Sequence, residues 1–546
     1  MDRKEYSNIL IPNVLHDYKY YEEKYPQRNL DKGSMVTRFA PSPTGFVHMG
    51  SLYTSFSDLV FAHQTNGVCY LRIEDTDSKR TVENGVEGIL DDFKNLGISF
   101  DEDPEKGGKY APYIQSERGD IYKAFAKKLI EEDKAYPCFC SEDDLNEIRT
   151  LQEVSKDRIG YYASYARCRD LKMEDVLKKI ENGEKYIIRL KSQGNFNHKI
   201  ILDDVIKGQI EMPENDMDIV IIKGDGLPTY HFAHAVDDHL MRTTHVFRGD
   251  EWVASYPVHE QLFKMLDFPL PKYGHIAPIT VKEGDKIRKL SKRKDKGAAI
   301  SYYAKEGIPT EVINLYLATV NNSNFEEWYN NNPDKSINDF TFTFDKMPVG
   351  GSLFDIEKLM NISKIYFSRQ SGSDIFEKLL PYLEKYDEEF YNIAKNNKEK
   401  LIKVLNIEKY IKRPRKDIAS FSDVRKYTWY MFDELYNDNA YKNVEVKDFY
   451  NINILQDYFD NFYDIRDDKD TWFNKIKLLA EKYNFAKEVK EYKNNPSLYK
   501  GHVGDICELI RVGITSLNQT PDLYEILKYL DKNSIQKRIT MFSKIL

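Results

Sequence analysis

Two short motifs, far apart in the chain, carry residue types that suit the binding of a triphosphate. The first spans residues 38–51 and reads RFAPSPTGFVHMGS, and the second spans residues 289–293 and reads KLSKR. In the first motif a Pro/Gly turn leads into a helix, where Gly50 lets a phosphate approach the N-terminal amides. His48 can donate a hydrogen bond to a phosphate oxygen, although a helix cap with a surface histidine fits the same residues.

The second motif lies within a strongly basic segment. Seven of the eleven residues in 286–296 are Lys or Arg. Runs of this kind are usually solvated surface. Paired with the first motif, the segment instead predicts a phosphate-binding loop, because Lys289 or Lys292 can neutralise the charge that develops on a leaving pyrophosphate.

An alternation of strands and helices positions these motifs. Strands are predicted at residues 36–39, 68–73, 219–222, 245–248 and 274–280, and helices at 50–63, 82–96, 232–240 and 252–266. Such alternation implies a parallel sheet, and in an open sheet of this kind the ligand binds beyond the carboxyl ends of the strands. Both motifs fall at those ends. Residues 137–215 break the alternation and are predicted to be an insertion.

The part of the chain after the basic segment is predicted to be helical. Apolar residues recur at i, i+3, i+4 and i+7 in residues 375–385, 398–409, 422–436, 471–483 and 506–516. The sequence thus predicts a split α/β nucleotide-binding fold with an insertion, followed by an all-α C-terminal region.

Composition limits the classes of protein that the chain can belong to. Its 546 residues predict two to four domains, and 41% hydrophobic with 31% charged residues is typical of a soluble globular protein. No apolar run is long enough to cross a membrane, and the polar N-terminus argues against secretion. Five cysteines suggest a reducing compartment, so we expect a cytoplasmic protein. The net charge of −8 leaves nucleic-acid binding to local basic segments, such as 286–296 and 409–416.

The motifs resemble those of the bacterial-type glutamyl-tRNA synthetases, a family of class I aminoacyl-tRNA synthetases. Residues 42–51 are similar to the HIGH signature of that class in its glutamyl form, and residues 289–293 to its KMSKS loop. Further similar stretches are RIEDTD at 72–77, LPTYHF at 227–232, VDD at 236–238 and RGDEW at 248–252. The resemblance runs from about residue 35 to 365.

The resemblance implies a role for each matching residue. The glutamate pocket would be lined by Arg38, Ser42, Glu74, Tyr230 and Arg248, and ATP with Mg²⁺ would be held by His48, Gly50, Glu251, Trp252, Lys289 and Lys292. His48, Lys289 and Lys292 are the expected catalytic residues. Guanidinium groups bind carboxylates through two parallel hydrogen bonds, which suits Arg38 and Arg248 to a dicarboxylic substrate. Glu74 suits the substrate ammonium group, but a salt bridge between Arg38 and Glu74 is an alternative.

The resemblance also implies a fold and a domain order. The expected fold is an α/β Rossmann-like class I synthetase catalytic domain with an α+β insertion, followed by an all-α C-terminal anticodon-binding domain. The expected parts are an N-terminal extension (1–33), the first half of the catalytic domain (34–136), an inserted acceptor-binding domain (137–215), the second half of the catalytic domain (216–288), the KMSKS-like loop with a stem-contact region (289–370) and the α-helical anticodon-binding region (371–546).

The implied function is the ATP-dependent attachment of L-glutamate to tRNA-Glu by a monomer, through a glutamyl-adenylate. Two departures from the family pattern bear on this function. Ser51 replaces the second histidine of the class signature, as is common in glutamyl enzymes, and His234 stands where they more often carry Asn. Glutaminyl-tRNA synthetases can carry His there and remain an alternative, although PSPTG and EDTD fit the glutamyl type. A non-discriminating glutamyl enzyme that also charges tRNA-Gln is a further alternative.

The insertion contains three cysteines with a spacing that resembles a family zinc site. Cys138, Cys140 and Cys168 are the candidate ligands, but the expected histidine is Asp170. Zinc prefers four ligands, and Tyr162, Tyr165 or Asp170 could be the fourth. The alternative is an eroded site with free thiols. The other two cysteines, Cys69 and Cys507, are predicted to lie in the core.

Overall fold

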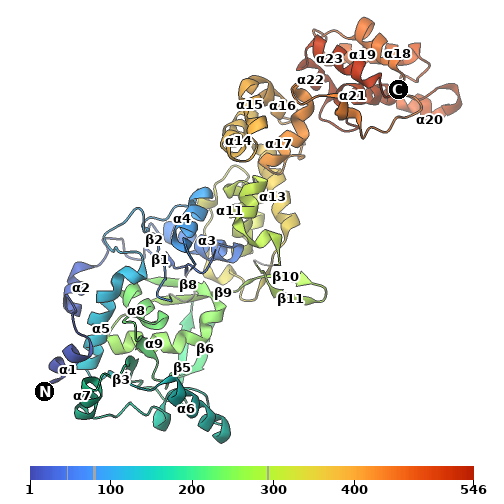
Figure 1. Cartoon of the computed structure of the whole chain (residues 1–546). Coiled ribbons are helices and arrows are strands. Elements are labelled where there is room, and N and C mark those ends of the chain that lie inside the picture. Colours follow the sequence, from blue (N-terminus) through green and yellow to red (C-terminus); the bar gives the residue numbers. More distant parts are fainter. Residues whose placement is uncertain (46, 78–81, 292–293) are drawn as a thin grey trace. The chain divides into compact units, whose positions relative to one another are not determined.

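The computed structural model describes residues 1–45, 47–77, 82–291 and 294–546 (Figure 1). The chain forms two compact units. The first comprises Met1–Tyr302 and Asn314–Asp355, and the second comprises Tyr303–Ile313 and Ile356–Leu546. The first unit contains all the strands of the described residues, and the second is helical. The predicted change from an α/β fold to an all-α region is therefore confirmed.

Four parallel strands form the centre of the first unit. β1 (Val36–Phe39) pairs with β2 (Val68–Leu71), and β8 (His245–Gly249) pairs with β9 (Lys272–Ile276). The Thr244 amide donates to the Val36 carbonyl at 2.9 Å, so β1 also lies beside β8. Every residue of β1 is buried, as expected for a parallel strand that is covered on both faces.

Helices cover this sheet, and all but α5 (Gly119–Glu131), which was not predicted, lie close to predicted positions. The others are α3 (Met49–His63), α4 (Gly85–Asn95), α8 (Tyr230–Leu240) and α9 (Tyr256–Leu266), with the 3-10 turn η3 (Asp250–Ser255) before α9. Helix α3 packs on β1, β2 and β8, while α5, α8 and α9 pack on one another. Apolar side chains of α5, α8 and α9 form a hydrophobic core with residues of β1 and β2.

The strand predicted at 219–222 does not belong to the parallel sheet, which corrects its predicted place in the strand–helix alternation. That strand is β7 (Val220–Ile222), and it pairs with β4 (Ile187–Leu190), which pairs with β3 (Ala135–Cys138), in an antiparallel sheet. The hairpin of β5 (Lys199–Asp204) and β6 (Gly208–Pro213) instead joins β9. Helices α6 (Glu142–Ser155) and α7 (Met173–Glu181) also lie in the insertion.

The N-terminal extension is an ordered part of the first unit. Its helices α1 (Arg3–Leu10) and α2 (Tyr18–Lys24) pack against α5. The Arg28 guanidinium donates two hydrogen bonds to Glu102, each 2.8 Å long. Glu22 accepts a bond from Arg242. These ion pairs join residues 1–33 to the region of the parallel sheet.

The basic segment begins as a β-hairpin. The predicted strand at 274–280 is in fact two strands, because β9 ends at Ile276 and β10 (Ile279–Glu283) follows. β10 pairs with β11 (Lys286–Lys289) and, on its other side, with β12 (Ser352–Leu353). Between the hairpin and β12 lie α10 (Ile300–Glu306), α11 (Thr310–Asn321) and α12 (Phe325–Asn331).

Two groups of helices make up the second unit (Figure 1). The first group is α13 (Ile356–Arg369), α14 (Gly372–Tyr386), α15 (Glu388–Asn396), α16 (Lys398–Asn406) and α17 (Phe421–Thr428). The second is α18 (Ile452–Asp457), α19 (Lys469–Lys482), α20 (Val489–Asn494), α21 (Val503–Thr515), α22 (Leu523–Lys528) and α23 (Lys532–Phe542). The helix predicted at 422–436 is shorter, since α17 ends at Thr428. Among the described residues, no helix is both long and apolar enough to span a bilayer.

Candidate active site

A cavity of about 480 Å³ opens at the carboxyl ends of β1 and β8, beside the start of α3. Its lining includes every residue predicted to bind glutamate or ATP except Lys292, which lies outside the described residues. These are Arg38, Ser42, His48, Gly50, Glu74, Tyr230, Arg248, Glu251, Trp252 and Lys289. Parallel strands place their carboxyl ends at one edge of the sheet, which is why segments so distant in sequence meet there.

His48 caps the N-terminus of α3. Its Nδ1 accepts a hydrogen bond of 3.0 Å from the Ser51 amide. The neutral ring therefore carries its proton on Nε2, which suits that atom to donation toward a phosphate oxygen. A Cβ atom at Gly50 would lie 3.0 Å from Nδ1 and Cε1 of this ring. Gly50 thus makes room for the imidazole, a reason that the sequence did not suggest.

The basic loop is partly neutralised by nearby carboxylates. Lys289 Nζ donates to Glu251 Oε1 at 3.1 Å, and both side chains are more than half exposed. Arg288 pairs with Asp295 through two bonds of 2.7 and 2.9 Å, and with Glu283. Lys289 is thus the described lysine of the motif that reaches the cavity.

Arg38 and Glu74 lie at the cavity floor with separate partners. Arg38 Nε donates to Asp238 Oδ2 at 3.2 Å, and Arg72 donates to Glu74 at 2.9 Å. Arg72 also donates to Asp238 at 2.6 Å. The alternative of a direct salt bridge between Arg38 and Glu74 is therefore wrong. Burial raises the pKa of Glu74, against the opposing effect of Arg72 and Arg38.

Arg248 is held by imidazole rings. Its Nε donates to His275 Nε2 at 2.9 Å, and its Nη1 lies 2.8 Å from His259 Nδ1. The guanidinium carbon also lies 4.7 Å from the centre of the Tyr273 ring. Sequence reasoning missed both histidines, because each lies on a helix or strand at a position typical of the core. No motif marked them.

His234, which raised the glutaminyl alternative, lies behind the cavity wall and not in its lining. The ring is fully buried, with Nδ1 2.9 Å from Asp238 and Nε2 2.8 Å from the Tyr273 hydroxyl. Burial lowers the pKa of His234 to about 4, so the ring is neutral at pH 7. It stacks on Tyr230 with 5.8 Å between ring centres and so backs a pocket residue.

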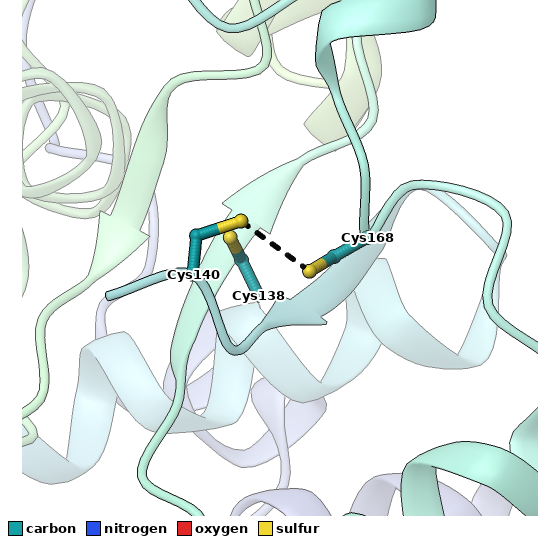
Figure 2. Close-up of side chains that lie close together, drawn as sticks. All are labelled: Cys138, Cys140 and Cys168. Carbon is teal, nitrogen blue, oxygen red and sulfur yellow. Dashed lines mark hydrogen bonds between the residues drawn. The ribbon is translucent and has the colours of Figure 1, made fainter. Parts of the chain in front are cut away.

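Three cysteines form a second candidate site, in the insertion (Figure 2). The sulfur atoms of Cys138, Cys140 and Cys168 all lie within 4.8 Å of one another, and Cys140 and Cys168 are 3.7 Å apart. Two ligands on a tetrahedral zinc with Zn–S bonds of about 2.3 Å would be about 3.8 Å apart. The donor set and spacing therefore fit zinc. Of the other two thiols, Cys69 is buried as predicted, whereas Cys507 is only half-buried.

The Tyr161 hydroxyl, which was not among the predicted fourth ligands, lies beside these thiols. It lies 3.4 Å from Cys138 Sγ and 3.3 Å from Cys140 Sγ. The three predicted candidates are engaged elsewhere. Tyr162 donates to the Arg158 carbonyl, Tyr165 donates to Asp157, and Asp170 is 84% exposed beside Lys191.

Comparisons with known proteins agree with this fold and site. Residues 34–359 match the family model of the class I tRNA synthetases (E and Q), catalytic domain. The cavity at the carboxyl ends of the strands lies within that match. The fold and the site together define a class I tRNA synthetase.

Full-length relatives show which family within this class the chain belongs to. A glutamate–tRNA ligase of Clostridium perfringens (strain 13 / Type A) is 42% identical over 99% of this chain and 100% of its own. One from Acetivibrio thermocellus is 43% identical over 99% of both chains. The chain belongs to the glutamate–tRNA ligase family. A crystal structure of a glutamate tRNA ligase from Elizabethkingia meningosepticum, in complex with its amino acid, matches with a TM-score of 0.73 at 27% identity, covering 93% of this chain and 98% of that one.

Proposed function

We propose that this chain attaches L-glutamate to tRNA-Glu with ATP, through a glutamyl-adenylate, and releases AMP and pyrophosphate. One observation carries the proposal. Two buried guanidinium groups, Arg38 and Arg248, line the same cavity as the helix start at His48. A dicarboxylic amino acid and a triphosphate can therefore be bound side by side. Membership of the glutamate–tRNA ligase family favours this reaction over glutamine charging.

In the first step, the chain's own groups orient two anions. Arg248 and Arg38 would bind the carboxylates of glutamate, and Glu74 would bind its ammonium group. The glutamate α-carboxylate then attacks the α-phosphate, and pyrophosphate leaves. Mg²⁺, when bound, offsets part of the triphosphate charge. His48, Lys289 and Lys292 would stabilise the charge that develops on the leaving group.

ATP contacts would complete the site. Gly50 gives the phosphates access to the amides of α3, while Glu251 and Trp252 would border the nucleotide. In the second step, a terminal ribose hydroxyl of the tRNA attacks the activated carbonyl, and AMP leaves.

The remaining parts of the chain would bind tRNA. We assign acceptor binding to residues 137–215, stem contact to 289–370 and anticodon reading to 371–546. Tyr410, in the basic segment 409–416, is 78% exposed and could stack on an unpaired base. Lys409 is unsuited to phosphate contact, because it is buried and its ammonium group donates to the Phe367 carbonyl. Burial lowers the pKa of Lys409 to about 8.

We also propose that the thiol cluster holds a structural zinc ion. Cys138 and Cys140 stand at the end of β3, and Cys168 comes from the segment that follows α6. Zinc bound to the three sulfurs would tie this segment to the sheet, with the Tyr161 hydroxyl beside it. None of the three cysteines lines the cavity.

Aminoacylation with purified components tests the proposed function. The chain is incubated with ATP, labelled glutamate or glutamine, and either tRNA-Glu or tRNA-Gln, and ATP–pyrophosphate exchange is followed with and without tRNA. The expected result is ATP-dependent transfer of glutamate to tRNA-Glu. The tRNA-Gln arm shows whether the enzyme is discriminating. Transfer of glutamine alone, or of glutamate without ATP, would refute the proposal.

A further inference from the structure

The buried guanidinium of Arg248 contacts only neutral groups among the described residues. His275, His259 and the Trp252 carbonyl accept its hydrogen bonds, at 2.9, 2.8 and 3.4 Å. No described Asp or Glu forms an ion pair with it. Arg38, in the same cavity, differs because it forms an ion pair with Asp238 at 3.2 Å.

The protons on both histidines follow from their partners. His275 Nδ1 lies 2.5 Å from Asp204 Oδ2, which can only accept, so Nδ1 carries the proton and Nε2 is left to accept from Arg248. His259 Nδ1 faces the guanidinium and must accept, so its Nε2 carries a proton. That proton points to His231 Nδ1, 2.9 Å away. Each ring can support Arg248 only while it is uncharged.

Burial keeps these rings uncharged. His259 and His275 are both fully buried, and the loss of solvent lowers the pKa of each. The Asp204 carboxylate accepts a hydrogen bond from the far nitrogen of the His275 ring, Nδ1, and forms no ion pair with Arg248. Two of the guanidinium's N–H directions are thus fixed by acceptors that do not neutralise it.

We propose that His259 and His275 are positioning residues that fix Arg248 while leaving its positive charge uncompensated, and that they thereby set the preference for an anionic amino-acid side chain over its amide. This inference rests on the proposed function. A carboxylate at either position would pair with Arg248 as Asp238 pairs with Arg38. The substrate carboxylate would then face an ion pair with no net charge, and it would bind little more strongly than an amide.

Near-isosteric variants that differ in charge provide the test. At His259, an Asn side-chain oxygen can replace Nδ1, so His259→Asn keeps a neutral acceptor and His259→Asp makes it anionic. At His275, His275→Gln and His275→Glu make the same comparison at Nε2. Glutamate and glutamine charging are measured for each, with the KM of glutamate, the KM of ATP and kcat.

The amide variants should keep the wild-type ratio of glutamate to glutamine kcat/KM within about threefold, well inside the effect of one charged hydrogen bond. The acidic variants should lose about 10- to 100-fold in that ratio, mainly through the KM of glutamate, with the KM of ATP unchanged. Equal ratios in the acidic and amide variants would overturn the inference, because the histidines would then only fill space.

Failure of the proposed function is distinguishable, because it would show as absence of glutamate charging by the wild-type enzyme. Thermal unfolding of each variant checks that it folds. If the acidic variants do not fold, His259→Asn is compared with His259→Leu, which removes the acceptor. The inference is supported if only the Leu variant loses the preference for glutamate over glutamine. It is overturned if the two variants have the same preference.

Discussion

Replacing Gly50 by Ala should lower the activity of the enzyme while leaving its stability nearly unchanged. The added Cβ would lie 3.0 Å from Nδ1 and Cε1 of His48, whereas carbon atoms in contact are about 3.5–4.0 Å apart. The ring must therefore shift by a few tenths of an ångström. That shift strains the 3.0 Å bond from the Ser51 amide and moves Nε2 away from the phosphate position.

The two stability effects of Gly50→Ala oppose each other. Weakening the helix cap costs about 1 kcal/mol, and Ala in place of Gly in a helix returns about 1 kcal/mol. The free energy of unfolding should therefore stay within about 1 kcal/mol of wild type. Displacement of a positioned group can cost about 100-fold in rate, so we expect a 10- to 100-fold loss in the rate of glutamyl-adenylate formation, on the order of 1.4–2.7 kcal/mol.

Gly88→Ala is the matched control for this variant. Gly88 lies in α4, and a Cβ there would meet no atom within 4 Å. It should gain up to about 1 kcal/mol of stability at full activity. The assay is single-turnover activation with tRNA present, together with urea unfolding. An unchanged activation rate in Gly50→Ala would refute the assignment of His48 and its dependence on Gly50.

Three further predictions follow from the site and the thiol cluster. Lys292→Ala should slow single-turnover activation by about 10²- to 10³-fold with tRNA affinity unchanged, and an unaltered rate would remove Lys292 from the mechanism. Cys140→Ser should lower both the zinc content, measured by metal analysis, and the midpoint of unfolding. Cys507→Ser is the control and should change neither quantity. Equal zinc content in the two variants would refute the metal site. The free energy of unfolding should fall as the pH drops from about 6.5 to about 4, because burial lowers the pKa of His231 and of His234 to about 4 and the unfolded chain then binds more protons. A flat urea midpoint over that range would contradict this.

The sequence by itself determined the local elements and the site residues they carry. β1 and α3 were predicted within one residue, because a buried β-branched strand, a Pro/Gly turn and a helix cap are all short-range signals. The gathering of Arg38, Tyr230 and Arg248 in one cavity also followed from sequence. The family resemblance implied this set of residues, and the rule that ligands bind at the carboxyl ends of parallel strands predicted where the site would lie.

Only the tertiary structure decided which distant segments pair and what surrounds each charge. The strand at 219–222 was predicted correctly, but its partner was not, because strand pairing depends on packing with residues far away in the chain. In the same way, no sequence motif marked His259, His275 or Tyr161. The role of a buried polar group depends on which atom satisfies its hydrogen bond. That partner is determined only when the chain has folded.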